Sequence, residues 1–112
     1  MKIKNYTVKF TKKANDDIND IYDYILNKYF DVFAAGNAYN RIFKDIRNII
    51  PYPYAYPEID IDLLRNKGIR LKKTRKYKIF YSVEDEIILI IHICSNKKSY
   101  ENIIVDLLER IT

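Results

Sequence analysis

Residues 77–94, YKIFYSVEDEIILIIHIC, determine the fold class of this chain. Within 77–83 every second residue is Tyr, Ile or Val, which is the period of a β-strand. The acidic triplet at 84–86 predicts a polar turn, and the β-branched run at 87–94 predicts a strand that is covered on both faces. We therefore expect two antiparallel strands, the second of which lies centrally in a sheet.

Two further strands and a final helix are expected around this pair. Apolar residues alternate with basic ones at 69–72 and with polar ones at 6–10, so each segment has the pattern of a strand. The tail at 100–111 returns to helical spacing and has a strongly amphipathic face. This face is expected either to pack on the sheet or to bind a partner.

Two helices are predicted between the first strand and the rest of the sheet, capped by Thr11 and started by Asp31, and the second ends at Pro51. The inward positions of the first helix are Ala14, Ile18, Ile21, Ile25 and Tyr29. Its opposite side carries Asp16, Asp17, Asp20 and Asp23. The inward positions of the second helix are Ala35, Ala38, Ile42, Ile46 and Ile49. The two helices are expected to form an antiparallel hairpin.

The chain of 112 residues is too short for two independent cores, so we expect one domain over residues 1–112. Its predicted class is α+β, with an N-terminal strand, a helical hairpin, an antiparallel three-stranded meander and a C-terminal helix. The segment at 51–57, PYPYAYP, predicts an extended connection because its prolines fix backbone torsions and remove donors. Its tyrosines either clamp this loop over the core, which we favour, or stack on bases.

Composition excludes several classes of protein. Hydrophobic residues make up 48% of the chain and charged residues 31%, which is typical of a globule and not of a disordered tail. The single Cys94 has no partner for an internal disulfide, so a reducing cytoplasm is the default. The start at 1–6 lacks the apolar core of a signal peptide, and the apolar run at 87–91 is too short to span a bilayer. We therefore expect neither secretion nor membrane insertion.

The positive charge is concentrated in one segment. The formal net charge is +5, and residues 65–78 contain eight Lys or Arg and no acidic residue. Such a block attracts polyanions or an acidic protein partner. The alternative is a solvated strand face whose lysines serve solubility.

Neither a metal nor another cofactor is predicted. One histidine and one cysteine give no zinc motif, and two isolated glycines give no phosphate-binding loop. His92 and Cys94 share a strand face at i, i+2 spacing and formally make a nucleophilic pair. Because both lie in an apolar strand, we favour a hydrogen-bonded histidine in the core or at its rim.

The basic residues of the two neighbouring strands are expected to gather into one concave cationic patch. Its predicted members are Arg70, Lys72 and Lys78, followed after the last strand by Lys97, Lys98 and Tyr100. Such cations stabilise an attacked phosphate or protonate a leaving oxygen, and the tyrosine stacks on a base or assists proton transfer. RNA supplies its own nucleophile through the 2′-hydroxyl, so this chemistry requires no metal.

The residues quoted so far resemble a known family. The opening YTVKFTKKA at 6–14, the motif GIR at 68–70 and the segment YKIFYSV at 77–83 follow one another in the order found in toxins of the RelE/ParE superfamily of bacterial type II toxin-antitoxin systems. The resemblance extends from residue 6 to about residue 108. It implies the same α+β fold and a growth-inhibiting toxin, with a cognate antitoxin as its partner.

One branch of this superfamily consists of ribosome-dependent mRNA endonucleases, and membership of it would make the ribosome and mRNA the targets. The catalytic residues that this branch implies here are Arg70, Lys78, Lys98 and Tyr100. The RNA-binding residues are Lys72, Lys73, Arg75 and Lys97. Lys78 stands where these endonucleases normally carry an arginine, and Ser95 stands where many carry a histidine.

The other branch, the ParE-like toxins, implies inhibition of DNA gyrase. We slightly favour mRNA cleavage because of the cationic strand face, and gyrase inhibition is the alternative. A third interpretation is a non-toxic basic binding module with the same fold. In each case a basic domain with an amphipathic terminal helix favours an acidic, partly disordered partner that folds on binding.

Overall fold

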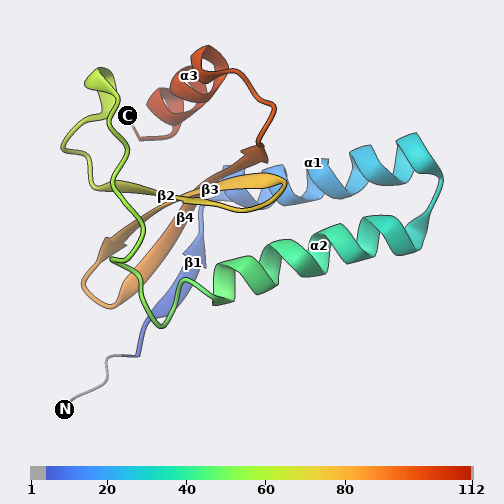
Figure 1. Cartoon of the computed structure of the whole chain (residues 1–112), viewed down its shortest axis with the longest axis horizontal. Helices are drawn as coiled ribbons and strands as arrows, with labels where there is room; N and C mark the ends of the chain where they lie inside the picture. Colours follow the sequence, from blue (N-terminus) through green and yellow to red (C-terminus); the bar gives the residue numbers. More distant parts are fainter. Residues whose placement is uncertain (1–4, 112) are drawn as a thin grey trace.

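A computed structural model describes residues 5–111, and Figure 1 shows its arrangement. The elements in chain order are β1 (Thr7–Phe10), α1 (Lys12–Tyr29), α2 (Val32–Arg47), the 3-10 helix η1 (Asp62–Leu64), β2 (Ile69–Lys73), β3 (Tyr77–Glu84), β4 (Ile87–Ser95) and α3 (Tyr100–Ile111). Both ends of the expected domain, 1–4 and 112, lie outside the described residues. The segment at 1–6, for which we expect no signal peptide, therefore lies mostly outside them as well.

The four strands form one sheet in the order β1-β4-β3-β2. β3 pairs antiparallel with both β2 and β4, whereas β1 pairs parallel with β4. The β-branched strand β4 therefore lies inside the sheet, as its sequence predicts, because an apolar strand needs cover on both faces. The predicted α+β class and the order of its elements are confirmed.

Helices cover both faces of the sheet (Figure 1). The α1–α2 hairpin covers one face, and the core there contains Ala14, Ile18, Ile42, Ile46, Ile49, Ile79, Tyr81, Ile88, Ile90 and Ile93. Helix α3 lies on the other face, where the core contains Leu64, Ile69, Phe80, Ile91, Cys94, Ile103 and Leu107. The amphipathic tail thus packs its apolar face on the sheet.

Helix α1 begins at the predicted cap. The Thr11 hydroxyl oxygen accepts a hydrogen bond of 3.0 Å from the backbone N–H of Ala14. We expect Thr11→Ala to lower the free energy of unfolding by about 1 kcal/mol, because the first turn loses this acceptor. Urea unfolding measures the change. Thr11→Ser keeps the hydroxyl, and a loss as large as that of the alanine variant would contradict the role of the cap.

Three details of the predicted hairpin are wrong. Helix α2 ends at Arg47 and not at Pro51, because residues 48–51 form turns before the proline. Tyr29 is exposed, since the hairpin extends beyond the sheet that would bury it. Asp17 does not lie on an outer face: its side chain reaches β4 and α3.

The segment at 51–57 forms turns and lies beside the sheet, but aromatic anchors account for only part of its attachment. Tyr56 packs against the hairpin-side core, whereas Tyr52 and Tyr54 are exposed. The Tyr81 hydroxyl donates a hydrogen bond of 2.6 Å to the Pro53 carbonyl. A short antiparallel bridge between Glu58 and Arg70 then covers the outer edge of β2.

Candidate functional site

The predicted cationic patch is divided between the two faces of the sheet. Arg70 pairs with Tyr81 and Lys72 pairs with Ile79, both of which belong to the hairpin-side core. Directly opposite residues in a sheet point to the same face, so Arg70 and Lys72 lie on the hairpin side. Lys78 lies next to Ile79 and points to the α3 side. The expectation that these cations gather on one face is therefore wrong.

On the hairpin side, Arg70 holds the 51–57 segment in place. Its Nη1 donates to the carbonyl oxygens of Tyr56 at 2.7 Å and Tyr54 at 3.2 Å. Its guanidinium also lies 5.0 Å from the centre of the Tyr54 ring. These contacts hold the guanidinium against main-chain carbonyls of the protein itself.

Lys72 is also engaged by the protein. It is 7% exposed, and its Nζ donates a hydrogen bond of 2.7 Å to the Asp45 carbonyl, near the C-terminus of α2. The ammonium complements the partial negative charge at that helix end. It also lies 5.2 Å from the centre of the Tyr56 ring. The sequence-predicted RNA-binding role of Lys72 would require it to leave these contacts.

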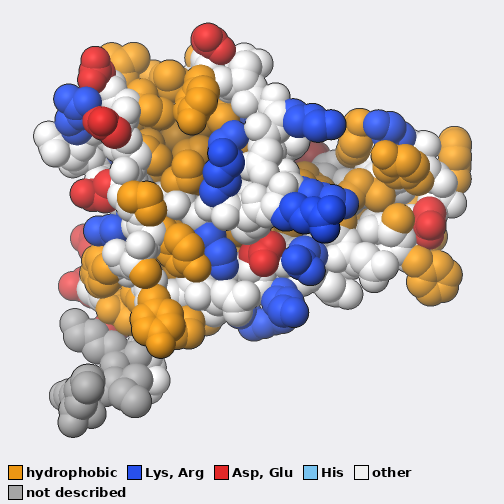
Figure 2. All heavy atoms as spheres, viewed as in Figure 1, with side chains coloured by type: hydrophobic (Ala, Val, Ile, Leu, Met, Phe, Trp, Pro, Cys, Tyr) orange, Lys and Arg blue, Asp and Glu red, His pale blue; other side chains and the backbone are white. Residues whose placement is uncertain are grey.

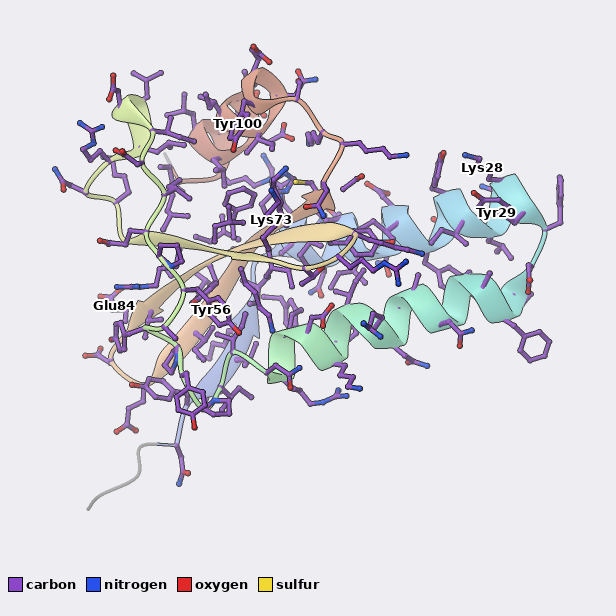
Figure 3. All side chains as sticks on the ribbon, in the orientation of Figure 1. Lys28, Tyr29, Tyr56, Lys73, Glu84 and Tyr100 are labelled. Atoms are coloured by element: carbon purple, nitrogen blue, oxygen red, sulfur yellow. The ribbon has the colours of Figure 1, made fainter. Side chains whose placement is uncertain are left out.

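On the α3 side, Lys78 lies beside Tyr100. Lys78 is 5% exposed, and its Nζ donates to the Asn96 carbonyl at 3.1 Å and lies 5.7 Å from the centre of the Tyr100 ring. Tyr100 itself is 63% exposed. Figure 3 shows Tyr100 and Tyr56 on opposite sides of the sheet.

A hollow of about 290 Å³ lies on this side of the sheet and is bordered by the 57–61 segment. Its walls are mainly apolar, and Lys78 and Tyr100 lie at its border. The lining residues are Pro57, Glu58, Ile59, Asp60, Ile61, Leu71, Lys78, Phe80 and Tyr100. The arrangement provides one shielded ammonium and one exposed aromatic ring next to an apolar surface.

Three of the predicted RNA-binding residues, Lys73, Arg75 and Lys97, are exposed: Lys73 is the last residue of β2, Arg75 lies in the β2–β3 turn, and Lys97 lies in the β4–α3 loop. Lys73 also pairs with Lys78 across the β2–β3 ladder. The Asn96 amide joins the loops by donating to the carbonyls of Thr74 at 2.9 Å and Arg75 at 3.0 Å. With Lys76, these exposed cations form what we call the basic edge: Lys73, Arg75, Lys76 and Lys97.

The predicted catalytic residue Lys98 lies in a different set of contacts. Its Nζ pairs with Asp106 on α3 and lies 3.4 Å from His92 Nε2. Lys98 therefore lies in an ion-pair network that connects the β4–α3 loop to α3, whereas Lys78 and Tyr100 lie beside the hollow. The structure thus brings Lys78, Tyr100 and Lys73 to one face of the sheet and leaves Arg70 and Lys72 on the other.

Asp17 is the centre of this network, which sequence analysis missed. It accepts hydrogen bonds from Arg110 Nη1 at 2.5 Å, Arg110 Nη2 at 2.9 Å and the Ile93 N–H at 3.0 Å, and it lies 2.8 Å from His92 Nδ1. Burial alone would raise the pKa of Asp17, but the bonds from Arg110, His92 and Ile93 outweigh it and lower that pKa to about 2. The network therefore joins α1, β4 and α3 through a carboxylate that is ionised at neutral pH.

A bulge in β4 contributes to this geometry. The β3–β4 register shifts between Phe80 and Tyr81, so both Ile91 and His92 face the α3 side. A sequence signal for Asp17 existed as well: positions 14, 17, 18 and 21 follow helical spacing, which places this aspartate at the border of the buried stripe. On α3, Arg110 lies one turn from Leu107 in the same way.

His92 and Cys94 are both buried, in agreement with the interpretation of His92 as a hydrogen-bonded core histidine. Burial raises the pKa of the Cys94 thiol to about 11, which disfavours the nucleophilic thiolate. Within residues 5–111 no three His, Cys, Asp or Glu side chains are grouped as metal ligands.

Comparison with known proteins identifies the family. Residues 8–100 match the family model of the ParE toxin of the parDE type II toxin-antitoxin system. No curated protein sequence gives a significant match. The chain belongs to the ParE toxin family, within the RelE/ParE superfamily, and is a toxin of a type II toxin-antitoxin system.

Solved structures share the fold at low identity. A chain of the chromosomal ParDE system of P. aeruginosa has a TM-score of 0.67 and 18% identity, covering 80% of this chain and 95% of that one. A chain of the RelBE2 toxin-antitoxin complex of Mycobacterium tuberculosis has a TM-score of 0.60 and 16% identity, with coverages of 82% and 99%. A free mutant of E. coli toxin RelE also has 0.60 and 16%, with coverages of 96% and 99%.

No helix in the described part of the chain is long and apolar enough to cross a membrane.

Proposed function

We propose that this toxin acts in the ParE-like manner, by inhibiting DNA gyrase, and that it does not cut mRNA. The observation that carries the proposal is the division of the predicted catalytic cations. Arg70 is held by carbonyls on the hairpin side of the sheet, Lys78 is held by a carbonyl on the α3 side, and Lys98 is paired with Asp106. The family match to ParE toxins supports the same conclusion.

A phosphoryl-transfer site must direct several donors at one phosphate. Charge stabilisation of this kind depends on donors that already surround the reacting group. Here Arg70 and Lys78 lie on opposite faces of the sheet, so they do not reach one phosphate together. The ammonium of Lys78 is in addition shielded by the Tyr100 ring and the Asn96 carbonyl.

The second candidate function is ribosome-dependent mRNA cleavage, in which the ribosome and mRNA are the targets. The observation that favours it is the exposed Tyr100 ring beside Lys78, which pairs in the β2–β3 ladder with Lys73 of the basic edge. An exposed aromatic ring and phosphate-binding cations are typical of single-stranded RNA recognition. Both mRNA and gyrase lie in the cytoplasm, where we propose that the toxin acts.

One experiment separates the two functions. Purified toxin is added to a gyrase supercoiling reaction and to programmed ribosomes whose mRNA ends are mapped by toeprinting. We expect supercoiling to be blocked and the mRNA to remain intact. New 3′ ends in the ribosomal A site would contradict the proposal.

Lys78→Met is the matched variant, since methionine fills a similar volume without the charge. A catalytic Lys78 would lose about 100-fold or more in cleavage, whereas a gyrase inhibitor with a structural Lys78 should keep its activity within about threefold. Thermal unfolding of the variant shows whether it is folded. A folded variant that has lost its block of supercoiling would contradict the structural role of Lys78.

We also propose an antitoxin partner with an acidic segment that binds along the basic edge. The four cations of this edge are exposed and lie at the end of β2 and on the two loops that Asn96 joins. The structural neighbours include toxins from the ParDE and RelBE2 systems. An acidic, disordered segment would gain charge-assisted contacts at this edge as it folds.

A further inference from the structure

The far end of the helical hairpin carries an unusual concentration of exposed apolar side chains. Figure 2 shows them at the right-hand end of the molecule, and Figure 3 labels Lys28 and Tyr29 there. We call this surface the hairpin tip, and its members are Tyr24, Tyr29, Phe30, Val32 and Phe33. Phe30 is 88% exposed and Phe33 is 83% exposed. Such a gathering of exposed apolar side chains at one end of the molecule is typical of an interaction site.

Phe30 has a strained backbone as well as an exposed side chain. Its backbone is in the left-handed conformation, with φ of 51°, where glycine is favoured and a bulky side chain is strained. It ends α1 by donating its backbone N–H to the Leu26 carbonyl at 2.8 Å, a bond that glycine would also make. The phenyl ring thus adds strain at an exposed position and little to the core. Local rules that are broken in this way are expected mainly at functional sites.

A lysine contacts both tyrosines of the hairpin tip. Lys28 Nζ donates to the Tyr24 hydroxyl at 3.1 Å and lies 5.4 Å from the centres of both the Tyr24 and Tyr29 rings. Rings that are ordered before binding lose less conformational freedom when a partner covers them. Tyrosine and phenylalanine are also enriched at the centres of protein interfaces.

The charge around the hairpin tip indicates what kind of partner it fits. Residues 20–33 carry three acidic residues, Asp20, Asp23 and Asp31, against one lysine, so this part has a formal charge of −2 in a chain of +5. This acidic surrounding repels nucleic acid and an acidic antitoxin segment. It also disfavours a symmetric contact between two copies, which would bring like charges together. The partner surface that complements the hairpin tip is an apolar pocket with lysine or arginine at its rim.

We infer that the hairpin tip is the surface by which this toxin engages its protein target, with Phe30 and Phe33 entering an apolar pocket bordered by basic side chains. The inference rests on the proposed function, because it requires that the target is a protein such as gyrase. It adds a contact surface separate from the basic edge, so target and antitoxin bind different parts of the molecule.

The test uses the double variant Phe30→Gly/Phe33→Ser in the full chain. Glycine relieves the strained backbone, so the variant should unfold at the same temperature as the wild type or a few degrees above it. We expect at least about a tenfold rise in the toxin concentration that half-inhibits gyrase supercoiling, and an equal loss of growth inhibition in cells. The matched control is Leu63→Ser, which removes another exposed apolar side chain, from η1, and should leave both activities unchanged.

A second variant tests the charge argument. Asp20→Lys/Asp23→Lys reverses the surrounding charge without touching the aromatic rings. We expect several-fold weaker inhibition of gyrase at low salt, and added salt should strengthen inhibition by the variant while it weakens inhibition by the wild type. Unchanged inhibition at low salt would contradict a basic rim on the target.

The outcomes separate this inference from the proposed function. If the wild-type toxin arrests growth without inhibiting gyrase, the proposed function is overturned. The hairpin tip is then tested by comparing growth arrest by the wild type and by the double variant. A folded double variant that still arrests growth as strongly as the wild type overturns the inference. Two further results would also overturn it. In sedimentation, the wild type could form a dimer that the double variant does not form, which would make the hairpin tip a dimer contact. In cells, the double variant could stay toxic when the antitoxin is co-expressed, which would make the hairpin tip an antitoxin contact.

Discussion

Arg110→Ala is expected to lower the free energy of unfolding by about 3 kcal/mol, because it leaves a buried carboxylate without its cation. The Asp17 side chain is only 11% exposed, and Arg110 binds both of its oxygens. Arg110 Nη1 also donates to the Ile91 carbonyl at 3.0 Å, so the substitution removes a contact between α3 and β4 as well. Urea unfolding followed by circular dichroism measures the change.

Two variants act as controls for this prediction. Glu109→Ala alters an exposed neighbour on the same helix and should change the free energy of unfolding by less than about 0.5 kcal/mol. Arg110→Lys keeps the charge but loses the bidentate contact with Asp17, so an intermediate loss in the free energy of unfolding is expected. If Arg110→Ala unfolds like Glu109→Ala, the network does not hold α3 to the rest of the protein.

The same network predicts how stability depends on pH. Asp17 has an ordinary pKa of 3.8, which hydrogen bonds lower to about 2 in the folded protein. A carboxyl with a lowered folded pKa stabilises the fold above its unfolded pKa and loses that contribution as the pH falls through 3.8 toward 2. With allowance for solvent screening the loss is about 1–2 kcal/mol. Asp17→Asn should be less stable at neutral pH and lose less than the wild type across this interval.

The fold was predictable because its signals are periodic and local. Alternation at 77–83 and 6–10, helical spacing in three segments and the β-branched run at 87–94 each specify an element. The central place of β4 follows from that run, because only an inner strand buries apolar side chains on both faces. The errors in the helical hairpin were the last residue of α2, the burial of Tyr29 and the face on which Asp17 lies.

The arrangement of the candidate site was not predictable, because it depends on strand register. In the β2–β3 ladder Lys73 pairs with Lys78 and Arg70 pairs with Tyr81, which sends Arg70 and Lys78 to opposite faces. A shift of one residue in the turn at 74–76 would have placed them on the same face. The sequence contains the cations but no local signal that determines this register.

The network around Asp17 was missed for a related reason. Asp17 and Arg110 are separated by almost the whole chain, so no local pattern relates one to the other. Periodicity marks each residue only as a polar side chain beside an apolar stripe. Long-range pairs of this kind depend on how the layers pack, and here on the bulge that turns both Ile91 and His92 toward α3.

Arg70→Ala is expected to destabilise the protein by about 2 kcal/mol, although the sequence marks Arg70 as a catalytic residue. Its guanidinium donates to the carbonyls of Tyr54 and Tyr56 and lies over the Tyr54 ring. Loss of charge-assisted bonds to main-chain carbonyls typically costs this much, and here it also loosens the segment over the edge of β2. Urea unfolding measures the loss, and limited proteolysis should cut first near residues 52–57.

Arg75→Ala is the matched control, because Arg75 belongs to the same basic block but is exposed on the β2–β3 turn. It should change the free energy of unfolding by less than about 0.5 kcal/mol. Equal stability of the two variants would show that Arg70 does not hold the 51–57 segment. If Arg70→Ala loses both stability and toxicity, the toxicity must be compared at equal folded concentration. A toxin that is then fully active per folded molecule would place Arg70 in the scaffold, whereas a residual loss would return it to the functional surface.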